Sequence, residues 1–114
     1  MKTLKTFKVK IYVGLQEGYN GDVHPIGDVE LVCREYCDAV GLAVTVTPTK
    51  FIYTGGSEDG CIVGLINYPR FPDTQESIKI HSINIAKILM ERLNQKRISI
   101  VCTDETTLLE HGDD

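Results

Sequence analysis

Between Phe7 and Gln16, apolar and polar residues alternate at almost every position. The apolar set is Phe7, Val9, Ile11, Val13 and Leu15, and the set between them is Lys8, Lys10, Tyr12, Gly14 and Gln16. Side chains alternate across a strand with this period of two, so the segment predicts a strand with one buried face. That face has to pack against helices supplied by the rest of the chain.

A loop and a helix are expected to follow this strand. The segment 17–27 holds Gly18, Asn20, Gly21, Pro25 and Gly27, a density of turn-forming residues that predicts a loop. From Val29 to Val40 the apolar residues recur at helical spacing. We expect Asp28 to cap this helix and Gly41 to end it, with the apolar side of the helix lying on the sheet.

A second helix is predicted from Asp73, which with Glu76 resembles a capping box, to about Asn94. Its expected core stripe is Ile78, Ile85, Leu89 and Leu93, and further apolar residues off that stripe are Ile80, Ile83, Ile88 and Met90. The apolar arc covers roughly 200°, against the ~100° that a surface helix needs. Either other elements of the chain or a second subunit must cover the remainder, and we expect a homo-oligomer, a dimer or larger.

The other strands are short and interrupted by turn residues. Their expected ranges are 42–53, broken or bulged at Pro48, then 61–68 and 97–103, with residues 107–109 as an optional short edge strand and 55–60 as a hairpin connection. Gly64 within a strand suggests a close approach by a neighbouring group. The order β-α-β-β-α-β predicts a ferredoxin-like α+β fold: a four-stranded antiparallel sheet with two helices on one face and a possible extra C-terminal strand.

Length and charge restrict the functional classes. A chain of 114 residues fits one domain, with a core over about 5–110 and a frayed tail at 111–114. The formal net charge of −4 argues against a nucleic-acid polymer as the partner. No window is apolar enough to span a membrane and no signal peptide is visible, so we expect a cytoplasmic protein without a membrane partner.

No catalytic motif, metal site or cofactor site is predicted. The spacing of Cys33, Cys37, Cys61 and Cys102 fits neither a zinc site nor a redox motif, so we expect four reduced, mostly buried thiols. Cys33 and Cys37 lie one helical turn apart, which leaves a shared metal as the alternative. His24 is a candidate for a catalytic role. The alternative is that it is an ordinary solvated residue of the loop.

The best candidate for a ligand site is the segment 67–72. It brings Asn67, Tyr68, Arg70 and Phe71 together at the end of a strand. Arginine binds phosphate or carboxylate bidentately, and an aromatic ring stacks on a base. We expect a small anionic, nucleotide-like ligand here, with Tyr19 of the glycine-rich loop and Arg97 nearby. The alternative is that the two rings only plug the end of the sheet.

Two segments carry a resemblance to a known family. The strand that ends in Val13-Gly14-Leu15, and the Asn94-Gln95 pair followed by the alternating Ile98 and Ile100, resemble the first anti-Thoeris sponge family of phage proteins. The resemblance implies an oligomer in the host cytoplasm that sequesters a cyclic ADP-ribose-like nucleotide without cleaving it. Two alternatives remain: a small dimeric ferredoxin-like enzyme of the oxygenase or isomerase type, and an interaction module with no small ligand.

Overall fold

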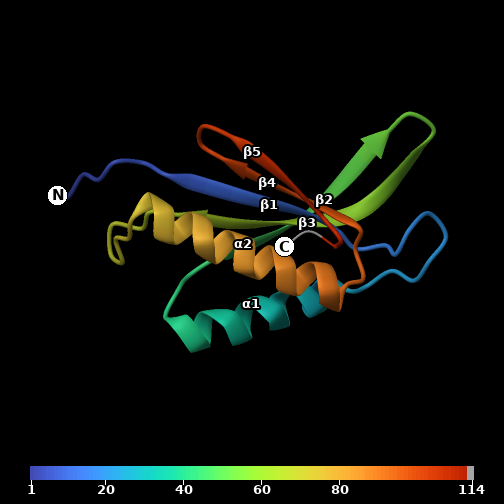
Figure 1. Cartoon of the computed structure of the whole chain (residues 1–114), viewed down its shortest axis with the longest axis horizontal. Coiled ribbons are helices and arrows are strands. Elements are labelled where there is room, and N and C mark those ends of the chain that lie inside the picture. The colour runs from blue at the N-terminus through green and yellow to red at the C-terminus, as the bar shows by residue number, and fades with distance from the viewer. Residues whose placement is uncertain (113–114) are drawn as a thin grey trace.

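The chain folds into one antiparallel sheet and two helices in the computed structural model, which describes residues 1–112; residues 113–114 of the expected frayed tail lie outside the described part. The elements are β1 (Lys8–Gly14), α1 (Ile26–Val40), β2 (Thr45–Tyr53), β3 (Gly56–Ile66), α2 (Gln75–Arg92), β4 (Arg97–Cys102) and β5 (Thr106–Glu110). The strand order is β2-β3-β1-β4-β5. Figure 1 shows both helices on the same side of the sheet.

The α+β class and the pair of helices are confirmed, whereas the expected count of four strands is wrong. The optional C-terminal strand is real and pairs with β4 from Val101↔Thr106 to Arg97↔Glu110. Leu109 is its one buried residue and lies opposite Ile98. A single apolar residue at the sheet edge is enough to extend the core by one strand.

The buried face of the sheet is the one that the alternation in β1 predicts. Val9, Ile11 and Val13 are at most 1% exposed, and their partners across β3, Leu65, Val63 and Cys61, are equally buried. Burial of such side chains stabilises the fold by about 1.5–3 kcal/mol each. The helix-facing side of the sheet is therefore occupied by the core, and any ligand site in the sheet has to use the other face.

Helix α1 begins at Ile26, two residues before the expected cap. The N-cap is Pro25, with φ −69° and ψ 150°, and it provides no side-chain hydrogen bond. Asp28 instead lies in the first turn, where its negative charge interacts favourably with the helix dipole. The C-terminal prediction is confirmed: Gly41 adopts a left-handed conformation, φ 73°, and its N–H donates to the Cys37 carbonyl at 2.9 Å.

Helix α2 is also capped differently from the prediction. Thr74 is the N-cap, and its hydroxyl oxygen accepts a hydrogen bond from the Ser77 N–H at 3.1 Å. Asp73 accepts from the Thr74 N–H and from the Ser77 hydroxyl, so it supports the cap without being it. The helix ends at Arg92, and Asn94, at φ 50°, turns the chain into β4.

The hairpin between β2 and β3 is tighter than expected. Tyr53 pairs with Gly56, so the connection is Thr54 and Gly55 alone, and residues 57–60 belong to β3 despite their turn-like composition. Pro48 causes no break, because β2 is an outer strand and the missing N–H can face away from β3. The close approach expected at Gly64 is confirmed: a Cβ there would lie 2.5 Å from the Thr45 hydroxyl.

The wide apolar arc of α2 is mostly used within the chain. Met90 is 6% exposed and belongs to the core, while Ile83 and Ile88 pack against it in part, so other elements of the chain cover this part of the arc. Ile80 is 51% exposed and is the part of the arc that remains open. Neither helix within residues 1–112 has the length and apolarity needed to cross a membrane.

Candidate functional site

The face of the sheet that the helices leave open carries a hollow beside Gly14. Gly14 of β1 lies directly opposite Gly60 of β3. Gly14 has no side chain and lines a hollow on this face, whereas the Phe51 ring takes up the space above Gly60. The hollow, of about 180 Å³, is lined by Tyr12, Gly14, Phe51, Glu58, Gln95, Arg97 and Ser99.

An aromatic wall bounds this hollow. The Phe51 ring lies over Gly60, where a Cβ would collide with ring atoms and would also come within 2.7 Å of the Val13 carbonyl oxygen. Tyr12 stands on β1 beside it, with the two ring centroids 6.4 Å apart and the planes tilted by 54°. Both side chains are half-buried. They offer ring faces to a planar or cationic ligand.

Two polar groups lie close to Gly14. A Cβ on Gly14 would lie 3.1 Å from Gln95 Oε1 and 3.4 Å from Glu58 Oε1. Gln95 is held in place because its Nε2 donates to the Gln16 carbonyl at 3.0 Å and to the Leu93 carbonyl at 3.2 Å. The amide oxygen is thereby presented to the hollow as an acceptor, beside the Glu58 carboxylate.

A second hollow, of about 400 Å³, shares Glu58, Gln95 and Arg97 with the first. It is completed by Gln16, Gly18, Tyr19, Tyr53 and Lys96. Arg97 Nε donates to Glu110 Oε2 of β5 at 3.3 Å, and the arginine side chain is 67% exposed. We call the two hollows together the open-face site. It combines aromatic rings, the amides of Gln16 and Gln95, one carboxylate and two cationic side chains.

The structure separates the six residues predicted for a ligand site into two groups. Tyr19 and Arg97 line the same hollow. The segment 67–72 lies at the other end of β1, because Lys8 pairs with Ile66 while Gly14 pairs with Gly60. The expected proximity of these two groups is therefore wrong. The register of β1 against β3, which short motifs do not reveal, sets them apart.

Within the segment 67–72, the side chain of Asn67 is used by the fold. Asn67 donates to the Lys5 carbonyl at 3.1 Å and accepts from the Asp73 N–H at 3.0 Å. The Phe71 N–H donates to the Tyr68 carbonyl at 2.9 Å, which closes a tight turn. The Arg70 guanidinium lies 5.5 Å from the centre of the Phe71 ring. A role of these four residues in binding stays a prediction.

Phe51, Glu58 and Gln95 line the open-face site but are not among the residues predicted for a ligand site from the sequence. Glu58 was assigned to a hairpin connection, whereas it pairs with Phe51 inside the sheet. A usable signal was present: Gly14 and Gly60 lie on or beside strand patterns, and a glycine within a strand marks a close approach by another group. The position of Gln95, just after a helix, gave no such signal.

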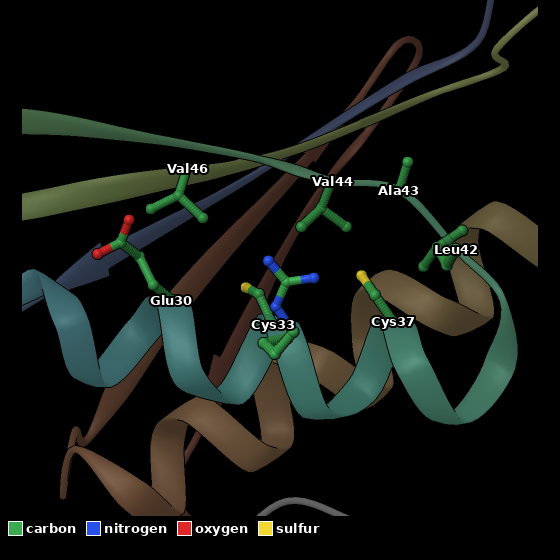
Figure 2. Close-up of a pocket in the computed structure, with 8 residues that line it drawn as sticks. Glu30, Cys33, Cys37, Leu42, Ala43, Val44 and Val46 are labelled. Atoms are coloured by element: carbon green, nitrogen blue, oxygen red, sulfur yellow. The ribbon is translucent and has the colours of Figure 1, made fainter.

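A third cavity, of about 440 Å³, lies between α1 and the start of β2 (Figure 2). Its lining combines the apolar Leu42, Val44 and Val46 with the charged Glu30 and Arg34 and with the thiols of Cys33 and Cys37. Burial raises the pKa of Cys33 to about 12, and it also raises the pKa of Cys37. The thiols are thus poor nucleophiles. Within residues 1–112 no three side chains of the metal-binding types converge.

Comparison with known proteins gives a match in structure and none in sequence. No family model matches the chain, and no curated protein matches it. A phage SAM lyase in its apo state superposes with a TM-score of 0.82 and 18% identity, over 100% of this chain and 98% of the lyase. The same kind of enzyme in complex with S-methyl-5′-thioadenosine gives a TM-score of 0.80 at 17% identity, over 96% and 95% of the two chains. At such identities the shared property is the fold, and it extends over the whole chain.

Proposed function

We propose that this protein binds a small adenosine-containing molecule at the open-face site, with S-adenosylmethionine as the first candidate. The observation that carries the proposal is the convergence of Tyr12, Phe51, Glu58, Gln95 and Arg97 on the face that the helices do not cover. The fold shared with a lyase whose complex contains S-methyl-5′-thioadenosine supports the same ligand class.

The chemistry of each group matches one part of such a ligand. An aromatic ring stacks on an adenine base, which contributes roughly 1–3 kcal/mol per base. Aromatic faces also attract a sulfonium cation, as they attract other cations, and the Glu58 carboxylate adds a negative charge beside them. Gln95 Oε1 can accept from the exocyclic amine of the base. Lys96 and Arg97 can bind the carboxylate of the amino-acid part.

Cleavage of the bound sulfonium is a second candidate function, favoured by the position of Glu58 in the aromatic hollow. In that reaction the bond between sulfur and the amino-acid side chain breaks and both electrons stay on sulfur, which leaves neutral S-methyl-5′-thioadenosine. The four-carbon fragment either bonds to its own carboxylate oxygen or loses a neighbouring proton to Glu58. Partial desolvation beside Phe51 favours a step that removes the positive charge.

A third candidate function is the one implied by the resemblance of the sequence to the anti-Thoeris sponge family. Lys96 and Arg97 beside Tyr19 suit a diphosphate next to a stacked base. On this alternative the protein is a phage anti-defence sponge that sequesters a cyclic ADP-ribose-like nucleotide, and the ligand leaves the site unchanged. The two ligand classes differ in charge, which makes them separable by experiment.

Two structural proposals accompany these. We infer that β1–β4 and the two helices follow the ferredoxin-like arrangement, with β5 as an addition; the order β2-β3-β1-β4 supports this description. We also propose a homo-oligomer, supported by the exposed Ile80 on α2 and by the open sheet face, which carries Phe51 and Tyr53.

Calorimetry with S-adenosylmethionine, S-methyl-5′-thioadenosine and cyclic ADP-ribose tests the function. We expect Glu58→Gln to weaken the binding of the cationic S-adenosylmethionine by about tenfold, or 1.4 kcal/mol. The binding of the neutral S-methyl-5′-thioadenosine should weaken by less than about twofold. The reason is that only the sulfonium of S-adenosylmethionine is attracted by the negative charge of Glu58 that the substitution removes. The matched control is Asp59→Asn, the next residue of β3, whose carboxylate pairs with Lys50 instead.

The outcomes separate the candidates. Chromatography of the calorimetry mixture detects any S-methyl-5′-thioadenosine formed, and its formation supports the lyase candidate. Tight binding of cyclic ADP-ribose with none of S-adenosylmethionine supports the sponge. Failure of all three ligands to bind the parent protein overturns the proposal. It supports the alternative that the protein is an interaction module with no small ligand.

A further inference from the structure

The loop between β1 and α1 is held down by a chain of side-chain hydrogen bonds centred on Glu17. Glu17 Oε1 accepts from Asn94 Nδ2 at 2.7 Å, and Glu17 Oε2 lies 2.9 Å from His24 Nε2. The other ring nitrogen, His24 Nδ1, lies 3.4 Å from Asp28 Oδ2. The network thereby joins the two ends of the loop to each other, to the start of α1 and to the segment after α2.

The geometry around His24 depends on its protonation. Each ring nitrogen faces a carboxylate oxygen, and a carboxylate only accepts hydrogen bonds. Both nitrogens can donate only in the doubly protonated ring; in a neutral ring one lone pair is directed at a carboxylate. The side chain is 21% exposed. Another carboxylate, Asp59, lines the same small cavity as His24 and pairs with Lys50 at 3.4 Å.

Glu17 is the charged partner in this network. Its pKa is lowered, first by the hydrogen bond from Asn94 and then by the hydrogen bond and charge of His24, while desolvation acts in the opposite direction. A carboxyl group with a lowered pKa stabilises the folded form above its ordinary value of 4.5, and this stabilisation is lost as pH falls through the lowered pKa. The full set of hydrogen bonds around His24 therefore needs an ionised Glu17 and a doubly protonated ring.

The loop that this network restrains forms part of the open-face site. The Glu17 N–H donates to the Asp22 carbonyl at 2.9 Å, so the loop folds back on itself around Gly18, which has φ 62°. At its tip Tyr19 is 86% exposed and lines the hollow that also contains Glu58 and Arg97. A shift of the loop moves Tyr19 relative to these groups.

We propose that Glu17 and His24 act as a proton-dependent clamp that positions the loop 16–23 against the open-face site, so that the loop loosens and ligand affinity falls when His24 loses its proton. Both are positioning residues, since the ligand contacts are made by Tyr19 and the groups of the site. The link to affinity rests on the proposed function, but the movement of the loop does not. Histidine is the side chain that ordinarily changes charge between pH 5 and 8.

A single fluorophore tests the movement without any ligand. The chain has no tryptophan, so Tyr19→Trp places one reporter at the loop tip. Between pH 5.5 and 8.5 we expect a single transition in its emission and anisotropy, with lower anisotropy at high pH. The transition should disappear when His24→Gln or Glu17→Gln is added. It should persist with His81→Gln, because His81 pairs with Tyr36 between the two helices.

The affinity arm uses S-methyl-5′-thioadenosine, which does not titrate in this range. With the parent protein we expect at least threefold weaker binding at pH 8.5 than at pH 5.5, and less than 1.5-fold change with His24→Gln; circular dichroism verifies that the variants are folded. A reporter without a transition, or one that keeps its transition with His24→Gln, overturns the clamp. A transition together with no binding of this probe at either pH supports the clamp and counts against the proposed adenosine ligand.

Discussion

Phe51 of β2 covers Gly60 of β3, so that the aromatic ring occupies the space that a Cβ on Gly60 would need. The backbone behind this position gives no room either, because the Val13 carbonyl oxygen would lie 2.7 Å from the same Cβ. The ring and the glycine thus form one unit. A side chain at Gly60 must displace both the aromatic wall of the site and the pairing of β1 with β3.

Gly60→Ala is therefore expected to lower the free energy of unfolding by about 1–3 kcal/mol, the usual cost of overpacking. Urea denaturation measures the change. The matched control is Gly27→Ala in the first turn of α1, where a Cβ meets nothing within 4 Å. That variant should be neutral or more stable by up to about 1 kcal/mol. An unchanged midpoint for Gly60→Ala contradicts the packing described for Phe51.

Arg97 and Arg70 provide a direct comparison between the two candidate ligand positions. Arg97 lines the open-face site, whereas Arg70 stacks on Phe71 at the other end of the sheet. We expect Arg97→Ala to weaken the binding of S-adenosylmethionine by about tenfold, near 1.4 kcal/mol. Arg70→Ala should weaken the binding of the same ligand by less than about twofold. Calorimetry on both variants measures this. A larger loss of affinity with Arg70→Ala than with Arg97→Ala would instead place the ligand site at the segment 67–72.

Self-association is expected to depend on Ile80. This residue is 51% exposed on α2, and an exposed isoleucine in a subunit contact is buried on assembly. Ile80→Glu should shift the sedimentation of the protein towards the monomer mass of 12.7 kDa. Lys87→Glu, at another exposed position of the same helix, is the control for added negative charge. A monomeric parent protein at micromolar concentration contradicts the assembly itself.

The four thiols are expected to react slowly in the native protein. All four cysteines are free, and Cys33, Cys61 and Cys102 are buried. Burial raises the pKa of Cys33 to about 12 and of Cys61 to about 11, so little thiolate exists at pH 8. Labelling followed by mass spectrometry should find Cys37, the half-buried thiol, modified first. Rapid joint labelling of Cys33 and Cys37 that zinc suppresses supports the metal alternative instead.

The same raised pKa values predict an alkaline loss of stability. A thiol that ionises near pH 9 when unfolded, but only at higher pH when folded, stabilises the folded form fully below pH 9. The free energy of unfolding should then fall as pH rises from about 9 to about 12. Cys33→Ala should reduce this slope, and urea titrations at several pH values measure it.

The sequence patterns predict the elements well and their ends less well. The alternation in β1 and the apolar stripe of α2 depend on burial, which local periodicity reports directly. Turn-like composition was misleading at residues 57–60, because pairing with β2 outweighs local preference there. Asp28 failed as a cap for a related reason: Pro25 already provides the extended residue from which the helix starts.

The site was only partly predictable, because it depends on register. Tyr19 and Arg97 were expected near a ligand, and they do lie together. Phe51 and Glu58 join them through two strand pairings, Phe51↔Glu58 and Gly14↔Gly60, that no single segment encodes. A one-residue shift in either pairing would send these side chains to the helix-covered face.

The position of β1 in the middle of the sheet has a consequence for how the chain matures. This strand precedes both of its partner strands in the sequence, and Tyr12 pairs with Ile62 and with Ser99, which lie 50 and 87 residues further along the chain. Such distant pairings make folding slow, because the entropy cost of closing long loops comes before the stabilising contacts form. Until β4 has been synthesised, one side of β1 stays exposed as an unpaired edge. This nascent form is the stage at which the protein is most prone to aggregation.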